Sequence, residues 1–312
     1  MDLLSSNGEN TAAGAARRAD ISLDDTMTID AKKLTAAGLL VAALALVYWP
    51  VMRRLFEAWA NDGNYSHGFL IVPLAAYFAW ERRAKLAAIT PKPSYIGLVI
   101  VAGSLFLLVA GTLGSEMFTT RVSLVGTIAG SVLFLYGWDA MKVLAFPIGF
   151  LLLMIPIPAI IFNQIAFPLQ LFASRVGESA ITTAGIPVLR EGNVLILANT
   201  TLEVAEACSG IRSLVSLVTL GIVFAYFTDP RFWVRSLIVA STIPVAILAN
   251  GARVAGTGMA AHWYGAEAAQ GFFHEFSGWA VFVVAFVMIL FIQRLILRMA
   301  PAATVRAADA AV

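Results

Sequence analysis

The chain has one cysteine, Cys208, in the segment EVAEACSGIRSL (203–214), directly before an apolar run that begins at residue 209. If that run is a helix, its N-terminus carries unpaired backbone N–H groups and the positive end of the helix dipole, which stabilise an anion. Cysteine thiols in such positions have lowered pKa values, and the thiolate is the nucleophile. The alternative is an inert buried side chain, because free cysteine is among the most buried residue types.

Arg253 lies near the end of the apolar run SLIVASTIPVAILANGARVAG. An arginine at the membrane centre costs roughly 2.5–3.5 kcal/mol on insertion scales, so arginines in apolar runs usually face a polar site. Asn250 precedes Arg253 by three residues, on the same helix face, and is placed to orient the guanidinium. The competing interpretation is that Arg253 snorkels to the lipid headgroups.

The three histidines, His67, His262 and His274, are candidates for acid–base chemistry, because the unperturbed histidine pKa is about 6.5. His274 immediately precedes the last apolar run, and His67 begins the second. An isolated histidine is more often a hydrogen-bonded structural residue, and that interpretation is open for both. No HxH or HExxH spacing occurs, so we expect neither a bound metal nor another cofactor.

Cys208, Arg253 and His274 would together supply what nucleophilic acyl transfer requires: a thiolate, a cation for the oxyanion, and an acid/base that moves protons. Arg212 follows Cys208 by four residues and therefore shares its helix face. It can stabilise the thiolate, or it can pair with Glu203 or Glu206 as part of the structure.

The composition indicates the kind of scaffold that holds these residues. Of 312 residues, 60% are hydrophobic and 13% charged, and the mean hydropathy is +0.83, which is typical of a membrane protein. The net charge of +2 is too small to indicate nucleic acid as a partner. A single cysteine excludes an intrachain disulfide.

A hydrocarbon core about 30 Å thick requires roughly 20 apolar residues per helix. We therefore predict an all-α polytopic membrane protein with about eight transmembrane helices, at residues 34–52, 66–80, 95–113, 121–138, 142–162, 209–228, 234–257 and 276–293. The mixed segment 163–185 predicts a helix in the interface rather than a span. The segment IPVLREGNVLILANTTLEVAEA, which precedes Cys208, predicts a short β-hairpin around its Glu-Gly-Asn turn.

Basic residues are retained on the cytoplasmic side of a membrane. With eight spans and the N-terminus inside, that side receives 14 of the 21 Lys and Arg residues. Cys208, Arg253 and the three histidines then fall on the outer side. Residues 1–33 lack the pattern of a signal peptide, and we predict that they form a disordered cytoplasmic tail. We expect a transmembrane domain at 34–298 and a cytoplasmic C-terminal tail at 299–312.

Six segments of the chain resemble the exosortase/archaeosortase family of membrane transpeptidases, and they occur in the family's order: YSHGFLIVPL (65–74), FPIGFLLLMIPIP (146–158), GIPVLREGN (185–193), EACSGIRSL (206–214), NGARV (250–254) and HEFSGW (274–279). The family's proposed catalytic set is a Cys, an Arg and a downstream His. The resemblance carries these roles to Cys208, Arg253 and His274. Arg212, Asn250 and His67 are accessory candidates. The histidine makes the chain similar to the bacterial exosortase type.

The resemblance implies an enzyme in the bacterial inner membrane with its active site on the outer, periplasmic face. Its partners would be membrane-anchored proteins with a PEP-CTERM-like C-terminal sorting signal, which it would cleave through a thioacyl-enzyme and transfer to an acceptor. The resemblance also links the chain to exopolysaccharide production and surface protein sorting. It leaves the oligomeric state unknown.

Two other classes of protein fit a chain with eight spans. A transporter for polysaccharide or lipid precursors would be expected to carry ionisable residues near the middle of the bilayer, whereas here they gather at its outer edge. A non-catalytic scaffold fits if Cys208 only packs. Replacement of Cys208 separates these alternatives from the sorting enzyme.

Overall fold

The computed structural model describes residue 35 and residues 38–198, 200–204, 210–265 and 272–299, with the backbone alone described at 210–213 and 272–277. The chain divides into two compact units, residues 1–55 and 56–312. The first unit contributes the N-terminal part of the helix Gly38–Asn61. The predicted N-terminal tail and residues 300–312 of the predicted C-terminal tail lie outside the described residues.

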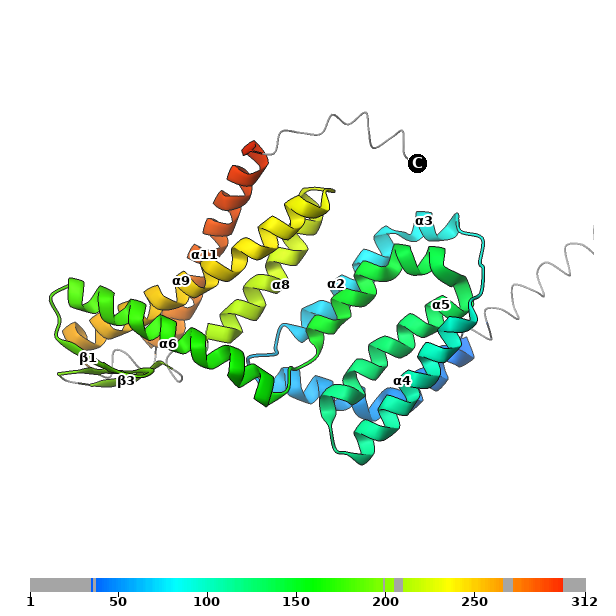
Figure 1. Ribbon diagram of the computed structural model, residues 1–312, viewed down its shortest axis with the longest axis horizontal. Coiled ribbons are helices and arrows are strands. Elements are labelled where there is room, and N and C mark those ends of the chain that lie inside the picture. The colour runs from blue at the N-terminus through cyan, green and yellow to red at the C-terminus, as the bar shows by residue number, and fades with distance from the viewer. Residues whose placement is uncertain (1–34, 36–37, 199, 205–209, 266–271, 300–312) are drawn as a thin grey trace, which may run out of the picture. The chain divides into compact units, whose positions relative to one another are not determined.

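Helices make up most of the second unit (Figure 1). A small sheet of β1 (Val188–Glu191), β2 (Val194–Leu197) and β3 (Thr201–Glu203) stands between the helices α6 and α8 in chain order. The helical elements are α2 (Gly68–Glu81), α3 (Arg83–Ala87), α4 (Tyr95–Leu113), α5 (Met117–Phe150), the 3₁₀ helix η1 (Leu151–Met154), α6 (Ala159–Thr183), α8 (Gly210–Thr228), α9 (Phe232–Tyr264) and α11 (Phe272–Met299).

By length and composition, six of the described helices are long and apolar enough to cross a membrane. The shorter helix α2 and the part of α8 from Leu214 to Thr228 are also apolar. The all-α polytopic membrane fold is thus confirmed. The predicted spans 121–138 and 142–162 correspond to two helical runs of the stretch Met117–Met154, which is broken at Gly137, and the second run ends before residue 162. We expected 163–185 to lie in the interface, and by length and composition Ala159–Thr183 also meets the criteria of a span.

The long helix α5 is interrupted at Gly137, whose backbone has φ +83° and ψ −169°. The chain reverses there, which makes two helical runs of one stretch (Figure 1). The loop before α4 pairs with this bend: Lys92 N–H donates to the Tyr136 carbonyl over 3.3 Å, and Ser94 N–H donates to the Leu133 carbonyl over 3.3 Å. A methyl group at position 137 would overlap the Lys92 carbonyl oxygen.

We expect Gly137→Ala to destabilise the protein by about 2–4 kcal/mol, because it combines a positive φ with a steric overlap against backbone. Thermal unfolding in nanodiscs measures the effect. The matched control is Gly149→Ala, since Gly149 lies in the same helix with no atom within 4 Å of the place its methyl group would take. An equal melting temperature for the two variants would contradict this account of the bend.

Helices α8, α9 and α11 pack against each other through two apolar clusters. One joins Leu217 of α8 to Val245 and Ala249 of α9 and to Ala285 and Ile289 of α11. The other, formed by Ala225, Val234, Ile238 and Ile296, lies near the α8–α9 turn. Since α9 runs antiparallel to both α8 and α11, the N-termini of α8 and α11 lie at the same end as the second half of α9 (Figure 1).

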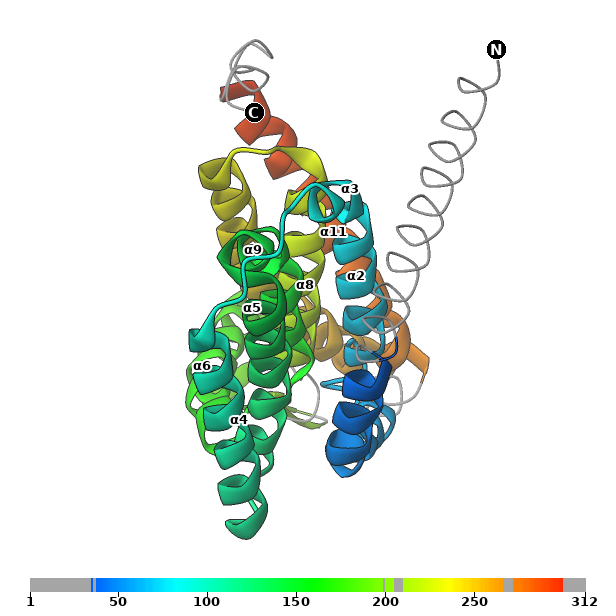
Figure 2. The ribbon, with the colours of Figure 1, turned by 90° about the vertical axis from the view of Figure 1, so that its right-hand side faces the viewer.

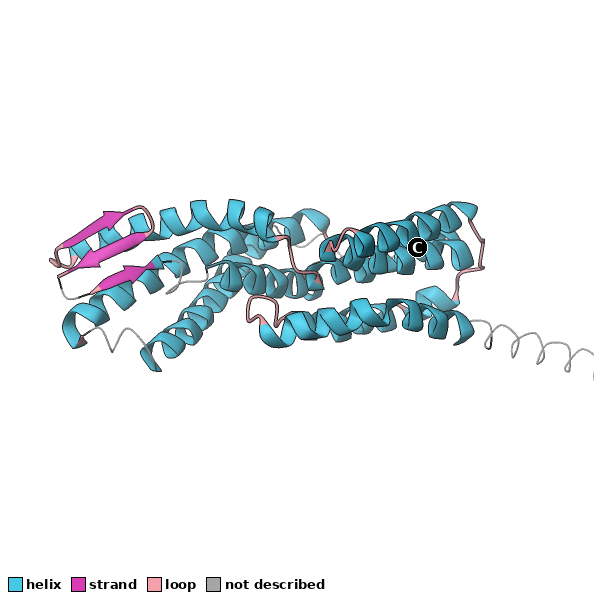
Figure 3. Cartoon of the chain, turned by 90° about the horizontal axis from the view of Figure 1, so that it is seen from below, coloured by secondary structure: helices cyan, strands magenta, loops and turns pink. Residues whose placement is uncertain are grey.

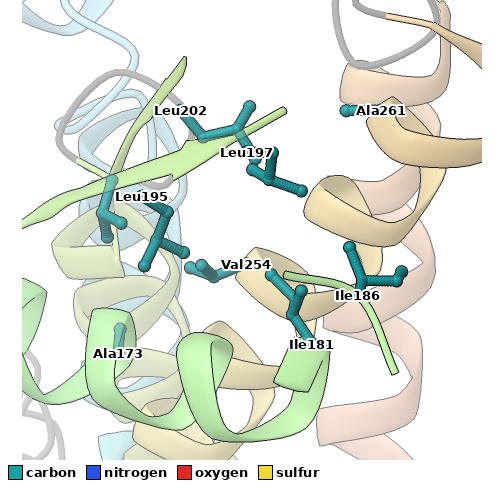
Figure 4. Close-up of a cluster of buried hydrophobic side chains, with 9 residues drawn as sticks. Ala173, Ile181, Ile186, Leu195, Leu197, Leu202, Val254 and Ala261 are labelled. Atoms are coloured by element: carbon teal, nitrogen blue, oxygen red, sulfur yellow. The ribbon is translucent and has the colours of Figure 1, made fainter. Parts of the chain in front are cut away.

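The predicted β-hairpin is present, and a third strand extends it into an antiparallel sheet of order β1-β2-β3 (Figure 3). Glu191 opposes Val194, and the two-residue loop between them begins at Gly192 with φ +64°. A glycine at that position is the mark of a type II′ hairpin turn. The sheet packs on α6 and on the second half of α9 through a buried cluster (Figure 4), which contains Ala173, Ile181, Ile186, Leu195, Leu197, Leu202, Val204, Val254 and Ala261.

The helix α3 and the α8–α9 turn lie at the same end of the bundle, away from the sheet (Figure 2). Their segments carry the basic residues Arg82, Arg83, Lys85, Arg231 and Arg235. The Tyr226 hydroxyl there donates to Glu81 over 2.8 Å and so joins the ends of α2 and α8. The guanidinium groups of Arg82 and Arg235 lie 5.2 and 5.0 Å from the Tyr226 ring centroid. Asp229, in the turn, forms an ion pair with Arg231 over 2.7 Å.

Candidate functional site

Arg253 projects from α9 onto the first turns of α11. Its Nη2 atom lies 3.2 Å from the place where a Cβ atom on Gly278 would stand, and its Cζ atom lies 3.4 Å from the same place. The guanidinium therefore rests on the bare backbone of Gly278, and the side chain is half-buried. Gly278 follows His274 by four residues, one helical turn, so Arg253 lies beside the part of α11 that carries His274.

The N-terminus of α8 reaches the same level of the bundle. Gly210 lies 18 residues before Thr228, and Asn250 lies 18 residues after Phe232, so equal helical rise from the α8–α9 turn brings Gly210 level with Asn250. Leu214, one turn into α8, packs on the cluster that contains Ala249. The start of α8, the Arg253 turn of α9 and the start of α11 thus lie together at one end of the bundle. We call this place the junction.

Asn250, the residue predicted to orient Arg253, is buried in α9 with 6% of its surface exposed. It stands one residue after Ala249, which belongs to the three-helix cluster, and one residue before Gly251, whose bare Cα lets Val176 of α6 approach closely. A polar side chain in this position lies inside the helix packing and not at the lipid surface. The structure thereby places Asn250 at the same junction as Arg253.

The other predicted site residues are described in part. His274 lies in the first turn of α11, and Arg212 lies in the first turn of α8, with the backbone described at both positions. Cys208 falls among residues 205–209, outside the described residues. The catalytic roles of all three stay predictions.

The described residues before and after the Cys208 segment belong to packed elements. Before it, Val204 is fully buried in the cluster that includes Val254, and its N–H donates to the Asn193 carbonyl over 2.9 Å. Val254 is the residue next to Arg253. After it, α8 begins at Gly210, two residues beyond Cys208. The described residues on either side of Cys208 are thus Val204, which shares a buried cluster with Val254, and Gly210, which is level with Asn250.

His67 makes its described contacts elsewhere. Its Nε2 atom lies 3.2 Å from the Leu153 carbonyl oxygen, so Nε2 carries the proton and donates. Two neighbours act in the same way: Trp59 Nε1 donates to the Met154 carbonyl over 2.9 Å, and the Tyr65 hydroxyl donates to the Ile157 carbonyl over 3.3 Å. The carbonyls of Leu153 and Met154 stand at the end of η1, where helical partners run out, and Ile157 follows that end. His67 thus caps a helix end.

Burial lowers the pKa of His67 below its usual value, so the folded state favours the neutral ring. A depressed histidine pKa contributes stability above about pH 6.5, which is lost as the pH falls through the lower folded pKa. We expect the melting temperature to fall between pH 7.5 and pH 5 by about 1–3 °C more in the wild type than in His67→Gln, which keeps a donor for the Leu153 carbonyl but does not titrate.

His67→Gln should also retain most of the activity at pH 7.5, which a processing assay measures. A loss of activity as large as that of a nucleophile variant, with an unchanged melting temperature, would instead place His67 in the chemistry.

One residue of the site was missed by the sequence reasoning. Gly278 lies inside the segment HEFSGW, yet its role becomes visible only from α9, because it forms the surface against which Arg253 packs. A small residue one turn after a candidate acid/base was the available signal. Within the described residues, no group of three or more His, Cys, Asp or Glu side chains is arranged to hold a metal ion.

The fold and the site define a polytopic helical membrane protein with a polar junction at one end of its helix bundle. The model of the transmembrane exosortase family (Exosortase_EpsH) matches residues 59–291, and the chain belongs to this family. The family assignment supports a membrane transpeptidase role in general terms. No curated protein and no solved structure matches the chain.

Proposed function

We propose that the protein is a cysteine-dependent transpeptidase that cleaves a C-terminal sorting signal, similar to PEP-CTERM, from exported membrane-anchored proteins and transfers them to an acceptor. The observation that carries the proposal is the packing of Arg253 on Gly278, which brings a guanidinium to the helix turn after His274. Membership of the exosortase family supports the same reaction class.

In this reaction the Cys208 thiolate attacks a peptide carbonyl carbon and forms a C–S bond. The negative charge that develops on the carbonyl oxygen is stabilised by Arg253 and by the N–H groups at the start of α8. His274 gives a proton to the departing amine as the C–N bond breaks, which leaves a thioester on Cys208. An acceptor nucleophile then attacks the thioester and releases the thiolate.

The depth of the junction fits a substrate that emerges from the membrane. The 18 residues between Phe232 and Asn250 correspond to about 27 Å of helix, close to the hydrocarbon thickness of about 30 Å. The basic residues Arg82, Arg231 and Arg235 lie toward the opposite end. By the tendency of basic residues to stay inside, that end is cytoplasmic and the junction faces the periplasm.

The test reconstitutes the full chain in vesicles with a tagged protein that ends in a short motif, a transmembrane helix and a basic cluster. We expect release of the C-terminal helix as a fragment that mass spectrometry identifies. A parallel substrate whose motif is scrambled but whose helix and basic cluster are intact serves as the control. Equal cleavage of both, or cleavage of neither under conditions where the chain is folded, would overturn the proposal.

A further inference from the structure

The strand β3 leaves one edge of the sheet open among the described strands. In the pairing of β2 with β3, Leu195 opposes Leu202. Two hydrogen bonds determine which residues of β3 direct their backbone groups toward β2. Leu197 N–H donates to the Thr200 carbonyl over 2.8 Å, and Val204 N–H donates to the Asn193 carbonyl over 2.9 Å.

Hydrogen-bonded pairs alternate along an antiparallel ladder. The backbone groups of Leu202 therefore point toward β2, and those of Thr201 and Glu203 point away from it, to the outer edge. The side chains also alternate along the strand: the Leu202 side chain is buried, and the Thr201 and Glu203 side chains are exposed. The outer edge thus offers the N–H and C=O groups of two residues in the spacing that another strand would use.

In the chain, this edge is close to the proposed nucleophile. Glu203 is five residues before Cys208, and Val204, directly after β3, belongs to the same buried cluster as Val254, the residue next to Arg253. The other edge of the sheet, β1, is separated from Cys208 by two strands and their connections, and its Arg190 side chain is engaged in an ion pair with Glu178 over 2.7 Å. Of the two edges, the β3 edge is therefore the better place to bind a substrate peptide whose cleaved bond must reach the junction.

We propose that the segment of the protein substrate around the cleaved bond binds in extended form as a fourth strand on the outer edge of β3. The inference rests on the proposed function. A thiolate can reach a backbone carbonyl of an extended peptide, whereas helical carbonyls are engaged in hydrogen bonds within the helix. Strand addition also takes most of its affinity from main-chain hydrogen bonds.

The first test replaces the outward N–H of β3. Glu203→Pro removes that donor, keeps the inward pairing of Leu202, and is tolerated because proline is accepted on edge strands. The matched control, Glu203→Gln, keeps the N–H and removes only the charge. We expect kcat/KM for cleavage to fall about three- to thirtyfold in the proline variant and less than twofold in the glutamine variant, with equal melting temperatures.

The second test varies the substrate and leaves the enzyme unchanged. Peptides that carry a single N-methyl amide at successive positions before the cleaved bond are processed by the full chain in nanodiscs. A strand pairs through every second residue on one edge, so we expect loss of processing at alternate positions. Acylation of Cys208 is recorded in the same samples.

The two readouts separate the two proposals. If Cys208 is acylated by the unmodified peptide but N-methylation shows no two-residue period and Glu203→Pro cleaves normally, strand addition is wrong and the proposed function stands. If the unmodified peptide is cleaved without acylation of Cys208, the proposed function fails, and the docking inference fails with it.

Discussion

Replacement of Cys208 by alanine or serine is expected to abolish processing of the C-terminal signal. With the thiol gone no thioester can form, and a serine hydroxyl is a far weaker nucleophile because almost none of it is ionised at neutral pH. Loss of a catalytic nucleophile costs more than about a thousandfold in kcat. Fragment release from a tagged substrate, followed over time by mass spectrometry, measures the loss.

The control for this experiment is the melting temperature of the variant, which should equal that of the wild type within about 2 °C, since cysteine, serine and alanine differ little in size. Should Cys208→Ala process its substrate at the wild-type rate, the mechanism would be wrong. A transporter or a scaffold would become the better interpretation of the chain.

The second large effect concerns Arg253. We expect Arg253→Ala to lower kcat about 10²- to 10³-fold, the usual loss when one oxyanion donor is removed. Arg253→Lys should recover only part of the activity, because an ammonium does not reproduce the planar fork of the guanidinium. Single-turnover cleavage assays measure both. A lysine variant with full activity would show that Arg253 contributes charge alone, and an alanine variant with full activity would remove it from the mechanism.

Gly278 gives an independent way to disturb Arg253 without replacing it. Gly278→Val places a branched side chain where Nη2 now lies 3.2 Å from the Cβ position, so the guanidinium must move. We expect a loss of about tenfold in kcat, comparable with misplacement of a positioning group. Gly256→Ala, in the same helix as Arg253 with nothing within 4 Å of the added methyl group, is the control and should remain active.

The sequence predicted the class of fold because hydropathy and length determine which segments suit a membrane. It also predicted that the chain between 121 and 162 divides into two spans, 121–138 and 142–162, close to the observed break at Gly137. It could not predict the close approach of Gly137 to the carbonyl of Lys92, because that contact comes from the loop before α4. The hairpin followed from its Glu-Gly-Asn turn. The strand β3 was missed because three residues, Thr201–Glu203, carry too little alternation to distinguish a strand from a loop.

For the site, the sequence predicted that Arg253 and the start of the last helix share one side of the membrane, and the structure brings them into contact through Gly278. It could not predict the hydrogen-bond partner of His67, which stays an accessory candidate. The partner of His67 is the backbone carbonyl of Leu153, 86 residues away, and a backbone carbonyl has no signature in the sequence. The roles of Cys208 and His274 rest on the family resemblance and on their place in the chain, and that of Arg212 rests on its spacing from Cys208 alone.

The most direct test of the account is to locate the covalent intermediate. The full chain is mixed with a substrate that carries a C-terminal signal, quenched in acid during turnover, digested, and analysed by mass spectrometry. The account predicts a thioester on the peptide that contains Cys208, with the mass of the substrate segment before the cleaved bond and with loss of the adduct in neutral hydroxylamine. Turnover that proceeds with an unmodified Cys208 peptide, or with the adduct on another residue, would contradict it.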